Sequence, residues 1–372
     1  MRKRSIIITI SFCLYILIFS LGVFLKKDRK FSDLENRNLT LKPSITFEKV
    51  KTGEYTEEIE AYLSDQIIFK DDLVRLSTSV KHFMGYSLMN GVYVERDGSY
   101  LTDFRYDEDK LSKNIGYIND FVDKNKDRSF YFLMIPNASY YYSKKREMLP
   151  SDEESLAISY IKDNLNKRVE LIDISPALGE HRDEYIFYRT DHHWTQDGAY
   201  LGYEELIKAL GETPVSKEEY DRTEMKKAFL GSSYSKAPVY TAAKDDFILY
   251  DNKNNTYNVD ITEESISFSD VYNYKNLYKK DMYTTYLDGN HAMEHITSKA
   301  DNDEKMLIIK DSYAHALVPF LADNYSDIYM ADLRYFHTES LSKFMKDNNI
   351  TKVIFIYNID FIDTDDNFVW LY

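Results

Sequence analysis

One polar stretch near the middle of the chain decides how the rest is interpreted: Tyr188-Arg189-Thr190-Asp191-His192-His193-Trp194-Thr195-Gln196-Asp197-Gly198. Asp191 and His193 are two positions apart, and in an extended segment such residues point to one side while His192 points to the other. A carboxylate beside an imidazole can fix its tautomer and stabilise its protonated form. The spacing therefore predicts an acid–base pair, although a packed histidine beside a surface aspartate has the same spacing.

A second stretch supplies a hydroxyl: Met306-Leu307-Ile308-Ile309-Lys310-Asp311-Ser312-Tyr313. The apolar run predicts a buried strand and residues 314–322 predict a helix, so Ser312 should lie at the carboxyl end of a strand. There the N–H groups that begin the next helix can face an oxyanion. Two alternatives stay open: Asp311 or Ser312 can simply cap the helix, and His315 can compete with His193 as the base.

A metal site is a further alternative, because Asp191, His192 and His193 are all possible ligands. Adjacent histidines on a strand diverge, however, and no other His/Glu pair at ligand spacing supports this interpretation. We therefore expect neither a metal nor a cofactor.

Short apolar runs alternate with helical patterns from residue 109 onward. The expected strands are 130–135, 169–172, 306–309, 327–330 and 353–357, and the expected helices are 109–123, 153–166, 196–209, 314–322 and 340–346. Thr195 should cap the third of these helices. The alternation predicts an α/β fold with a mostly parallel sheet that helices cover on both faces.

Residues 212–300 break this alternation. They are polar and rich in tyrosine, with expected strands near 247–250 and 283–287, so we expect a β-rich insertion there. Earlier in the chain, residues 90–94 and 99–101 flank Asp97-Gly98 and predict a β-hairpin. Residues 31–51 are expected to form an extended tether, and a helical pattern begins at Gly53.

The N-terminal segment is apolar. Residues 6–25 carry no charged side chain, which is enough to span a bilayer as a helix, and no small-x-small cleavage site follows. We expect residues 1–30 to be a short cytoplasmic tail and a retained single-pass anchor. Residues 31–372 would then form one extracytoplasmic domain.

Charge and cysteine usage exclude several classes of protein. The net charge of −15 argues against nucleic acid as a partner. The single cysteine, Cys13, lies inside the expected anchor, so the exported part has no disulfide, thiol nucleophile or cysteine-based metal site.

The motif Asp191-His192-His193-Trp194 resembles the naming motif of the DHHW family. That family is similar to the alginate O-acetyltransferases, which resemble SGNH hydrolases. Further blocks look like the family's signature and occur in its order: Glu35-Asn36-Arg37, Leu63-Ser64-Asp65-Gln66, Phe69-Lys70-Asp71, Asn90-Gly91-Val92-Tyr93, Lys310-Asp311-Ser312-Tyr313 and Asp332-Leu333-Arg334-Tyr335-Phe336. The resemblance covers roughly residues 31–372 in scattered blocks.

The resemblance implies a catalytic triad with Asp191 as acid, His193 as general base and Ser312 as nucleophile. The Asp-His pair precedes the serine, which implies a permuted SGNH-like order, and Lys-Asp rather than Gly-Asp precedes Ser312. Gly231 and Asn358 are the candidates for the oxyanion residues.

The function implied is that of a membrane-anchored extracytoplasmic O-acyltransferase that modifies a cell-surface or exported polysaccharide. A multispanning membrane acyltransferase would supply the acyl groups. Two alternatives remain: a carbohydrate O-acetyl esterase on the same scaffold, and a non-catalytic glycan-binding or assembly protein at the cell surface.

Overall fold

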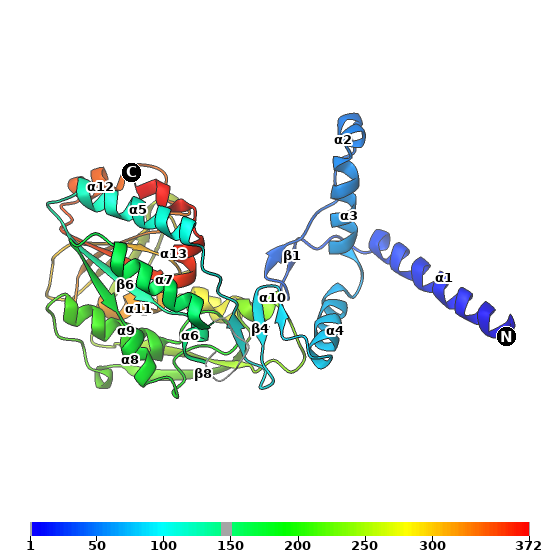
Figure 1. Ribbon diagram of the computed structural model, residues 1–372, viewed down its shortest axis with the longest axis horizontal. Coiled ribbons are helices and arrows are strands. Elements are labelled where there is room, and N and C mark those ends of the chain that lie inside the picture. The colour runs from blue at the N-terminus through cyan, green and yellow to red at the C-terminus, as the bar shows by residue number, and fades with distance from the viewer. Residues whose placement is uncertain (1, 143–150, 372) are drawn as a thin grey trace. The chain divides into compact units, whose positions relative to one another are not determined.

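The computed structural model describes residues 2–142 and 151–371 of the chain (Figure 1). The contacts between residues divide it into two compact units. Unit 1 comprises Met1–Asn90 and Tyr234–Ala242, and unit 2 comprises Gly91–Ser233 and Ala243–Tyr372. The short segment from 234 to 242 therefore leaves unit 2, joins unit 1 and returns.

Unit 2 is built on a central sheet in the order β11-β10-β12-β14-β13-β15-β6-β7. The strands are β6 (Ser129–Ile135), β7 (Val169–Asp173), β10 (Tyr257–Ile261), β11 (Ile266–Phe268), β12 (Met293–Ser298), β13 (Met306–Lys310), β14 (Asp327–Ala331) and β15 (Lys352–Asn358). The run from β14 to β7 is parallel, whereas β12, β10 and β11 add antiparallel strands at one edge. The expected α/β class and mostly parallel sheet are confirmed.

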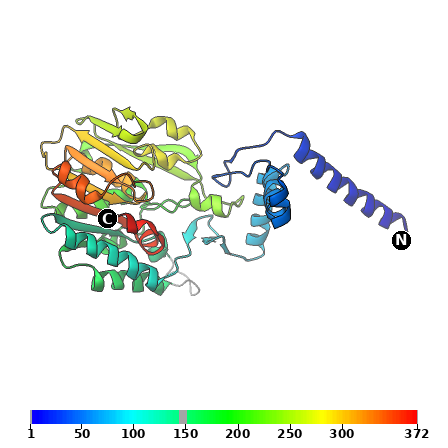
Figure 2. The same cartoon turned by 90° about the horizontal axis from the view of Figure 1, so that it is seen from above.

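The central strands β6, β13, β14 and β15 are apolar on both faces, and each face of the sheet has its own core. In β6, for example, Phe130, Phe132 and Met134 join one hydrophobic cluster, and Leu133 and Ile135 join the other. This division follows from the alternation of side chains along a strand. The first cluster packs under α5 (Glu108–Lys124), α7 (Ser151–Asn164), α12 (Leu341–Asp347) and α13 (Ile359–Thr364), and the second under α9 (Gln196–Ala209) and α11 (Ala314–Leu321) (Figures 1 and 2).

Residues 212–300 contain a two-stranded sheet and part of the central one. β8 (Asp221–Phe229) pairs with β9 (Asp245–Asp251), while β10, β11 and β12 extend the central sheet. The strand expected near 283–287 is wrong, because Met282–Thr285 is a 3-10 helix, η5. Leu287 and Asp288 follow with φ of 54° and 61°, so the chain turns there instead of extending.

The expected tether at residues 31–51 is also wrong in part. A short antiparallel pair forms between β1 (Phe31–Ser32) and β2 (Arg37–Asn38), and α2 (Phe47–Thr52) follows. The side chain of Thr46 caps α2 by accepting a hydrogen bond from the Lys49 N–H, and Gly53 ends the helix at a φ of 84°. The expected hairpin is confirmed: β4 (Val92–Val94) pairs with β5 (Tyr100–Thr102).

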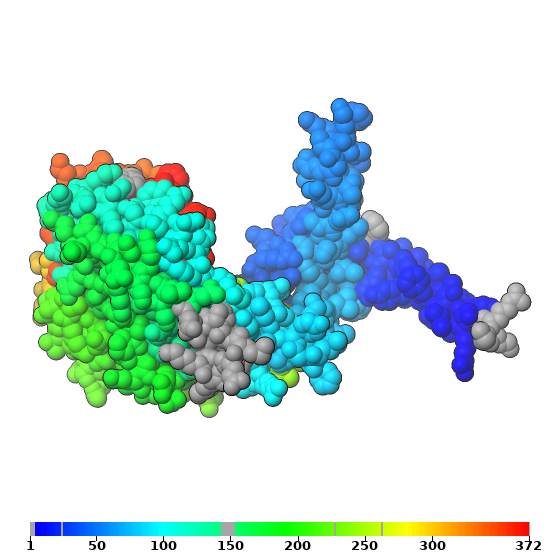
Figure 3. Space-filling view, in the orientation of Figure 1, coloured from blue at the N-terminus to red at the C-terminus, as the bar shows by residue number. Residues whose placement is uncertain are grey.

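Unit 1 begins with α1 (Arg2–Leu25), followed by α3 (Glu54–Gln66) and α4 (Lys70–Phe83). Within α1, the stretch Arg4–Val23 is long and apolar enough to be a membrane span or a signal sequence. Most of the apolar side chains of α1 are exposed, and Figure 3 shows the surface of this helix in dark blue.

Candidate active site

Three side chains from distant parts of the chain form a hydrogen-bonded relay. His193 Nδ1 lies 2.6 Å from Asp191 Oδ1, and His193 Nε2 lies 2.7 Å from Ser312 Oγ. All three residues are buried. An Nδ1–H bond to Asp191 leaves Nε2 unprotonated, so that it can accept the proton of the Ser312 hydroxyl. The residues that the sequence singles out are therefore brought together.

The segment that carries Asp191 and His193 is a tight loop and not the extended segment expected. Phe187 and Trp194 form an isolated bridge at its base, and the His193 N–H donates to Asp191 Oδ1 at 3.0 Å. This side-chain-to-backbone turn, rather than strand geometry, brings the carboxylate to the imidazole. The expectation that His192 points away is wrong, since its ring centroid is 3.8 Å from that of His193.

Ser312 occupies the turn between β13 and α11, at the carboxyl end of a central parallel strand. The buried carboxylate of Asp311 shapes this turn by accepting the N–H groups of Tyr313 at 2.8 Å and Asn358 at 2.7 Å. Burial raises the pKa of Asp311 to about 6, although these N–H groups oppose the shift. Ser312 does not cap α11, because its hydroxyl is bonded to His193.

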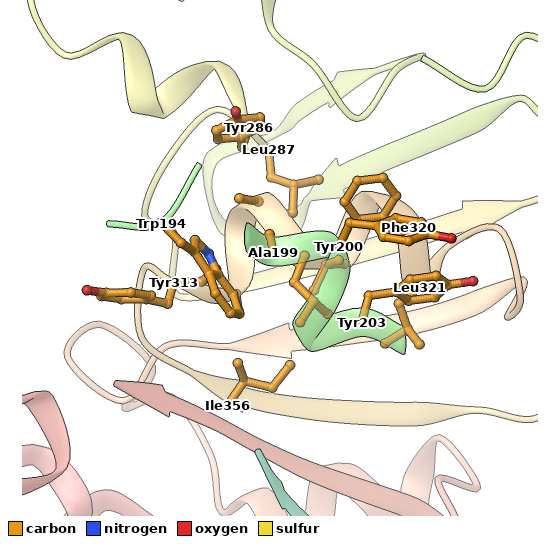
Figure 4. Close-up of a cluster of buried hydrophobic side chains, with 14 of the residues drawn as sticks. Trp194, Ala199, Tyr200, Tyr203, Tyr286, Leu287, Tyr313, Phe320, Leu321 and Ile356 are labelled. Atoms are coloured by element: carbon orange, nitrogen blue, oxygen red, sulfur yellow. The ribbon is translucent and has the colours of Figure 1, made fainter. Parts of the chain in front are cut away.

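Two contacts hold the loop against the turn. The Trp194 indole N–H donates to the Tyr313 carbonyl at 3.0 Å, and the Tyr313 hydroxyl donates to the His192 carbonyl. Figure 4 shows the Trp194 and Tyr313 rings side by side in the buried cluster under the site. Segments 119 residues apart are thereby fixed to one another at the position where the relay needs them.

Two aromatic rings lie against the imidazole of His193. The ring of Tyr283, from η5, stacks on it with centroids 3.7 Å apart and planes inclined by 5°, and the His192 ring lies on it as well. A stacked ring fixes the plane of the imidazole, and its π face favours a positive charge there. No pattern in the sequence points to Tyr283, because its segment has the composition of a strand.

The backbone of residues 231 and 232 packs closely against the Asp191 carboxylate. The Ser232 N–H donates to Asp191 Oδ2 at 2.7 Å, and a Cβ on Gly231 would lie only 2.2 Å from the same oxygen. Burial alone would raise the pKa of Asp191, but His193 and the Ser232 N–H outweigh it and hold that pKa well below its usual range. The group stays ionised, as a partner of an imidazolium must.

The family model described as DHHW protein matches residues 70–331. The chain belongs to the DHHW family.

Several solved structures are similar to the chain. A DHHW family protein from Eubacterium siraeum is 26% identical, with a TM-score of 0.62 over 74% of this chain and 95% of that one. Bacillus cereus PatB1, solved with a sulfonyl adduct, is 21% identical, with a TM-score of 0.64 over 76% and 98%. The O-acetyltransferase domain of Pseudomonas putida AlgJ is 15% identical over 74% and 93%, with a TM-score of 0.48, which does not establish a shared fold. No curated protein is significantly similar in sequence.

The loop of this DHHW protein has a second buried support, Asp245. Its carboxylate accepts the N–H groups of Arg189 and Thr190, both at 2.8 Å, together with the hydroxyl of Tyr185. Burial raises the pKa of Asp245. The sequence analysis missed this residue, which lies in β9 and has no motif of its own.

The candidate oxyanion residues of the DHHW protein lie beside the relay. The Gly231 N–H donates to Thr190 Oγ1 at 3.2 Å. The Asn358 side chain donates to the Ile135 carbonyl at 3.0 Å, and its Oδ1 accepts the Asp360 N–H at 3.1 Å as the N-cap of α13. Their oxyanion roles stay predictions.

His315, the competing base, faces a different partner. Its Nε2 lies 2.6 Å from Lys310 Nζ, and burial, followed by the nearby Lys310 charge, holds its pKa well below the ordinary value. The imidazole that bonds the Ser312 hydroxyl is that of His193, whereas His315 bonds Ser312 through its backbone N–H, which donates to the Ser312 carbonyl at 3.3 Å.

The distances between possible ligand atoms are compatible with the metal alternative. Donor atoms of Asp191, His192 and His193 lie within 4.8 Å of one another. Both ring nitrogens of His193 are already bonded, however, and His192 Nδ1 lies 2.6 Å from Ser232 Oγ. An ion at this position would have to break the relay, so the arrangement suits proton transfer better than metal binding.

Proposed function

We propose that this protein is a membrane-anchored O-acyltransferase that modifies a cell-surface or exported polysaccharide through an acyl-serine intermediate. The observation that carries the proposal is the relay from Asp191 through His193 to Ser312, with heavy-atom distances of 2.6 and 2.7 Å. These are the distances at which a general base can take the proton of a nucleophile. Membership in the DHHW family and its resemblance to alginate O-acetyltransferases support the same class of reaction.

In the first half of the reaction, His193 takes the hydroxyl proton of Ser312 while Ser312 Oγ attacks the carbonyl carbon of the acyl donor. Asp191 stabilises the imidazolium that results. The tetrahedral intermediate then collapses, the bond to the leaving group breaks, and His193 returns the proton to the leaving group. The acyl group is now an ester of Ser312.

In the second half, His193 takes the proton of an acceptor hydroxyl, and the acceptor oxygen attacks the acyl-serine. Collapse of the second intermediate transfers the ester to the acceptor and returns the proton to Ser312 Oγ. A sugar hydroxyl as acceptor gives O-acyl transfer, and water gives the esterase alternative.

Each tetrahedral intermediate carries a negative oxygen that needs hydrogen-bond donors. The first donor in this proposal is the Ser312 N–H, at the turn into α11. Gly231 and Asn358 are the further donors in this proposal; in the resting structure the Gly231 N–H bonds Thr190 Oγ1 and the Asn358 side chain bonds the Ile135 carbonyl. The order of the parts, with the Asp-His pair before the serine, fits a permuted SGNH-like scaffold.

The membrane assignment rests on α1. In this proposal α1 is retained as a single-pass anchor, its short N-terminal tail stays in the cytosol, and residues 31–372 lie outside. A multispanning membrane acyltransferase then passes acyl groups outward to Ser312, and the anchor keeps the two partners in the same membrane.

The test is to trap the acyl-enzyme. The full chain in detergent is mixed with an aryl acetate, quenched, and examined by peptide mass spectrometry for an acetyl group. The wild type and Ser159→Ala, whose serine is exposed on α7, should be acetylated at Ser312. Ser312→Ala should give no adduct, and His193→Ala should form it at least about a hundredfold more slowly. Acetylation that persists in Ser312→Ala would remove the nucleophile, and none in the wild type would favour the non-catalytic alternative.

A second measurement separates the two enzyme alternatives. The trapped acyl-enzyme is offered a panel of neutral and acidic oligosaccharides, and the products are separated from free acetate. Accumulation of an acetylated oligosaccharide identifies a transferase. Release of acetate alone, at a rate independent of every acceptor, identifies an esterase.

A further inference from the structure

Helix α4 presents its apolar side to the outside. Leu73, Leu76, Val80 and Phe83 recur at intervals of three or four residues, which aligns them along one face of the helix. They are 36, 52, 48 and 92% exposed, respectively. A contiguous apolar stripe of this kind marks an interaction surface.

The opposite face of α4 is the one that packs inside unit 1. The Thr78 hydroxyl donates to the Pro238 carbonyl, Ser79 Oγ accepts the Tyr240 N–H at 3.1 Å, and the Arg75 guanidinium lies over the Tyr240 ring at 5.5 Å. The helix therefore buries polar groups against residues 234–242 and leaves the stripe of Leu73, Leu76, Val80 and Phe83 uncovered. A helix that only completes the core of a water-soluble unit would instead bury its apolar face and expose its polar face.

The start of α4 is fixed next to the end of α1. Arg29, four residues beyond α1, makes a bidentate ion pair with Asp71 in the first turn of α4, with both N–O distances 2.8 Å. The Gln66 side chain bonds both the N–H and the carbonyl of Arg29, at 2.9 Å each, and the Tyr62 hydroxyl donates to Asp28 at 2.9 Å. Figure 1 shows α3 and α4 running across the direction of α1.

We propose that α4 lies in the surface of the lipid bilayer, with Leu73, Leu76, Val80 and Phe83 inserted among the acyl chains. The proposal rests on the anchor role of α1 given above, because the contacts of Arg29 and Gln66 then hold α4 at the level where the chain leaves the membrane. A helix that lies across the anchor with one apolar face has the form of an interfacial membrane helix. Lys81, exposed and outside the stripe, suits the headgroup region.

A second copy of the chain fits the stripe less well. The stripe keeps coiled-coil spacing over the 14 residues of α4, which is two heptads. A coiled coil needs about three to four sustained heptads. Lipid, by contrast, is present wherever α1 spans a membrane, and it covers a short stripe as well as a long one.

The test measures what surrounds the stripe in the full chain. Cys13 is the single native cysteine, so Cys13→Ser gives a background into which one cysteine is returned as Leu76→Cys or Phe83→Cys, with Lys81→Cys as the matched control outside the stripe. Each variant receives a nitroxide label and is reconstituted into vesicles of phosphatidylethanolamine and phosphatidylglycerol. Power saturation then compares accessibility to oxygen, which concentrates in lipid, and to a water-soluble nickel chelate.

The labels at 76 and 83 should be several-fold more accessible to oxygen than to the nickel chelate, and the label at 81 should show the opposite order. Access of the chelate to 76 and 83 would overturn the proposal. So would shielding from both reagents, which indicates a protein cover, or dipolar broadening between two labels, which indicates a second copy.

Two controls separate this result from the other proposals. Retention of the labelled chain in the vesicles after alkaline washing tests the anchor role of α1 on its own. Acetylation of Ser312 in the same samples tests the acyltransferase proposal, which the position of α4 does not affect.

Discussion

At the scale of single residues, the position of the Asp191 carboxylate depends on residue 231 having no Cβ. An alanine Cβ at 231 would lie 2.2 Å from Asp191 Oδ2, so Gly231→Ala must displace the carboxylate from His193. We expect acyl-enzyme formation to fall by at least about tenfold, because a misoriented base loses much of its effect. The measurement is the rate of Ser312 acetylation, with circular dichroism to verify the fold.

The control for this substitution is Gly116→Ala. Gly116 lies within α5, and a Cβ there would meet nothing within 4 Å. The control should keep full activity and gain up to about 1 kcal/mol of stability, as alanine does over glycine in a helix. A Gly231→Ala protein as active as this control would contradict the role assigned to the close approach.

Tyr283 is the second residue whose effect can be measured. Its ring stacks on His193, while its hydroxyl has no hydrogen-bond partner among the residues that the structure describes. Tyr283→Phe should therefore keep most of the activity, and Tyr283→Leu should lower the rate of acylation by about tenfold because the imidazole loses its stacked ring. Equal losses in both variants would assign the effect to the hydroxyl instead.

The sequence named the three relay residues but not the groups that support them. Asp191, His193 and Ser312 have chemistry that short motifs reveal. Tyr283 and Asp245 act through packing and hydrogen bonds that form only when distant segments meet, so no local pattern marks them. The expected geometry of the Asp191–His193 pair was wrong because a polar loop and an extended segment give the same two-residue spacing.

At the scale of elements, α9 links the loop to the core through its first turn. Thr195 accepts a hydrogen bond from the Gly198 N–H at 3.4 Å and donates to the Tyr185 carbonyl at 2.7 Å. Thr195→Ala should cost about 1–2 kcal/mol in the free energy of unfolding, as loss of a helix cap does. Thr195→Ser keeps both bonds and should cost much less. Equal midpoints of urea unfolding for the two variants would contradict this.

Elements whose sequence has one clear hydrophobic pattern were predicted well. The strands β6, β13, β14 and β15 are largely apolar runs, as a sheet covered on both faces requires, and these four and β7 were all anticipated. The prediction of a strand at 283–287 was wrong because Tyr and Thr occur both in strands and in buried 3-10 turns. The helix α2 was missed because six residues are too short for a helical period to show.

At the scale of the whole molecule, buried carboxyl groups set the response of stability to pH. Glu294 is fully buried, and its carboxylate oxygens have no hydrogen-bond partner among the described residues. Burial raises its pKa from 4.5 to about 8. Between these two values the folded protein holds a proton that the unfolded chain has lost, so stability should fall as the pH rises through this range.

Glu294→Gln removes this dependence. At pH 5 the variant and the wild type should unfold at similar denaturant concentrations, because the wild-type group is then protonated. At pH 9 the variant should be more stable by an amount on the order of a few kcal/mol, from about 1.4 kcal/mol per pKa unit. Urea unfolding at both pH values checks this, and a constant difference between them would contradict it.

The division into two units was beyond the reach of sequence patterns. Residues 234–242 belong to unit 1, although residues 91–233 of unit 2 separate them from the rest of unit 1 in the chain. Nothing in their composition sets them apart from the polar, tyrosine-rich region around them. The contacts of Pro238 and Tyr240 with α4, and that of the Lys236 carbonyl with Asn90, reveal where they belong.

This return of the chain has a consequence for biosynthesis. The first 90 residues leave the ribosome early, yet the surface on which Thr78 and Ser79 pack is not synthesised until residue 240 is complete. The nascent N-terminal unit stays incomplete while residues 91–240 are synthesised. During that interval the polar face of α4 lacks the backbone partners that Pro238 and Tyr240 later supply.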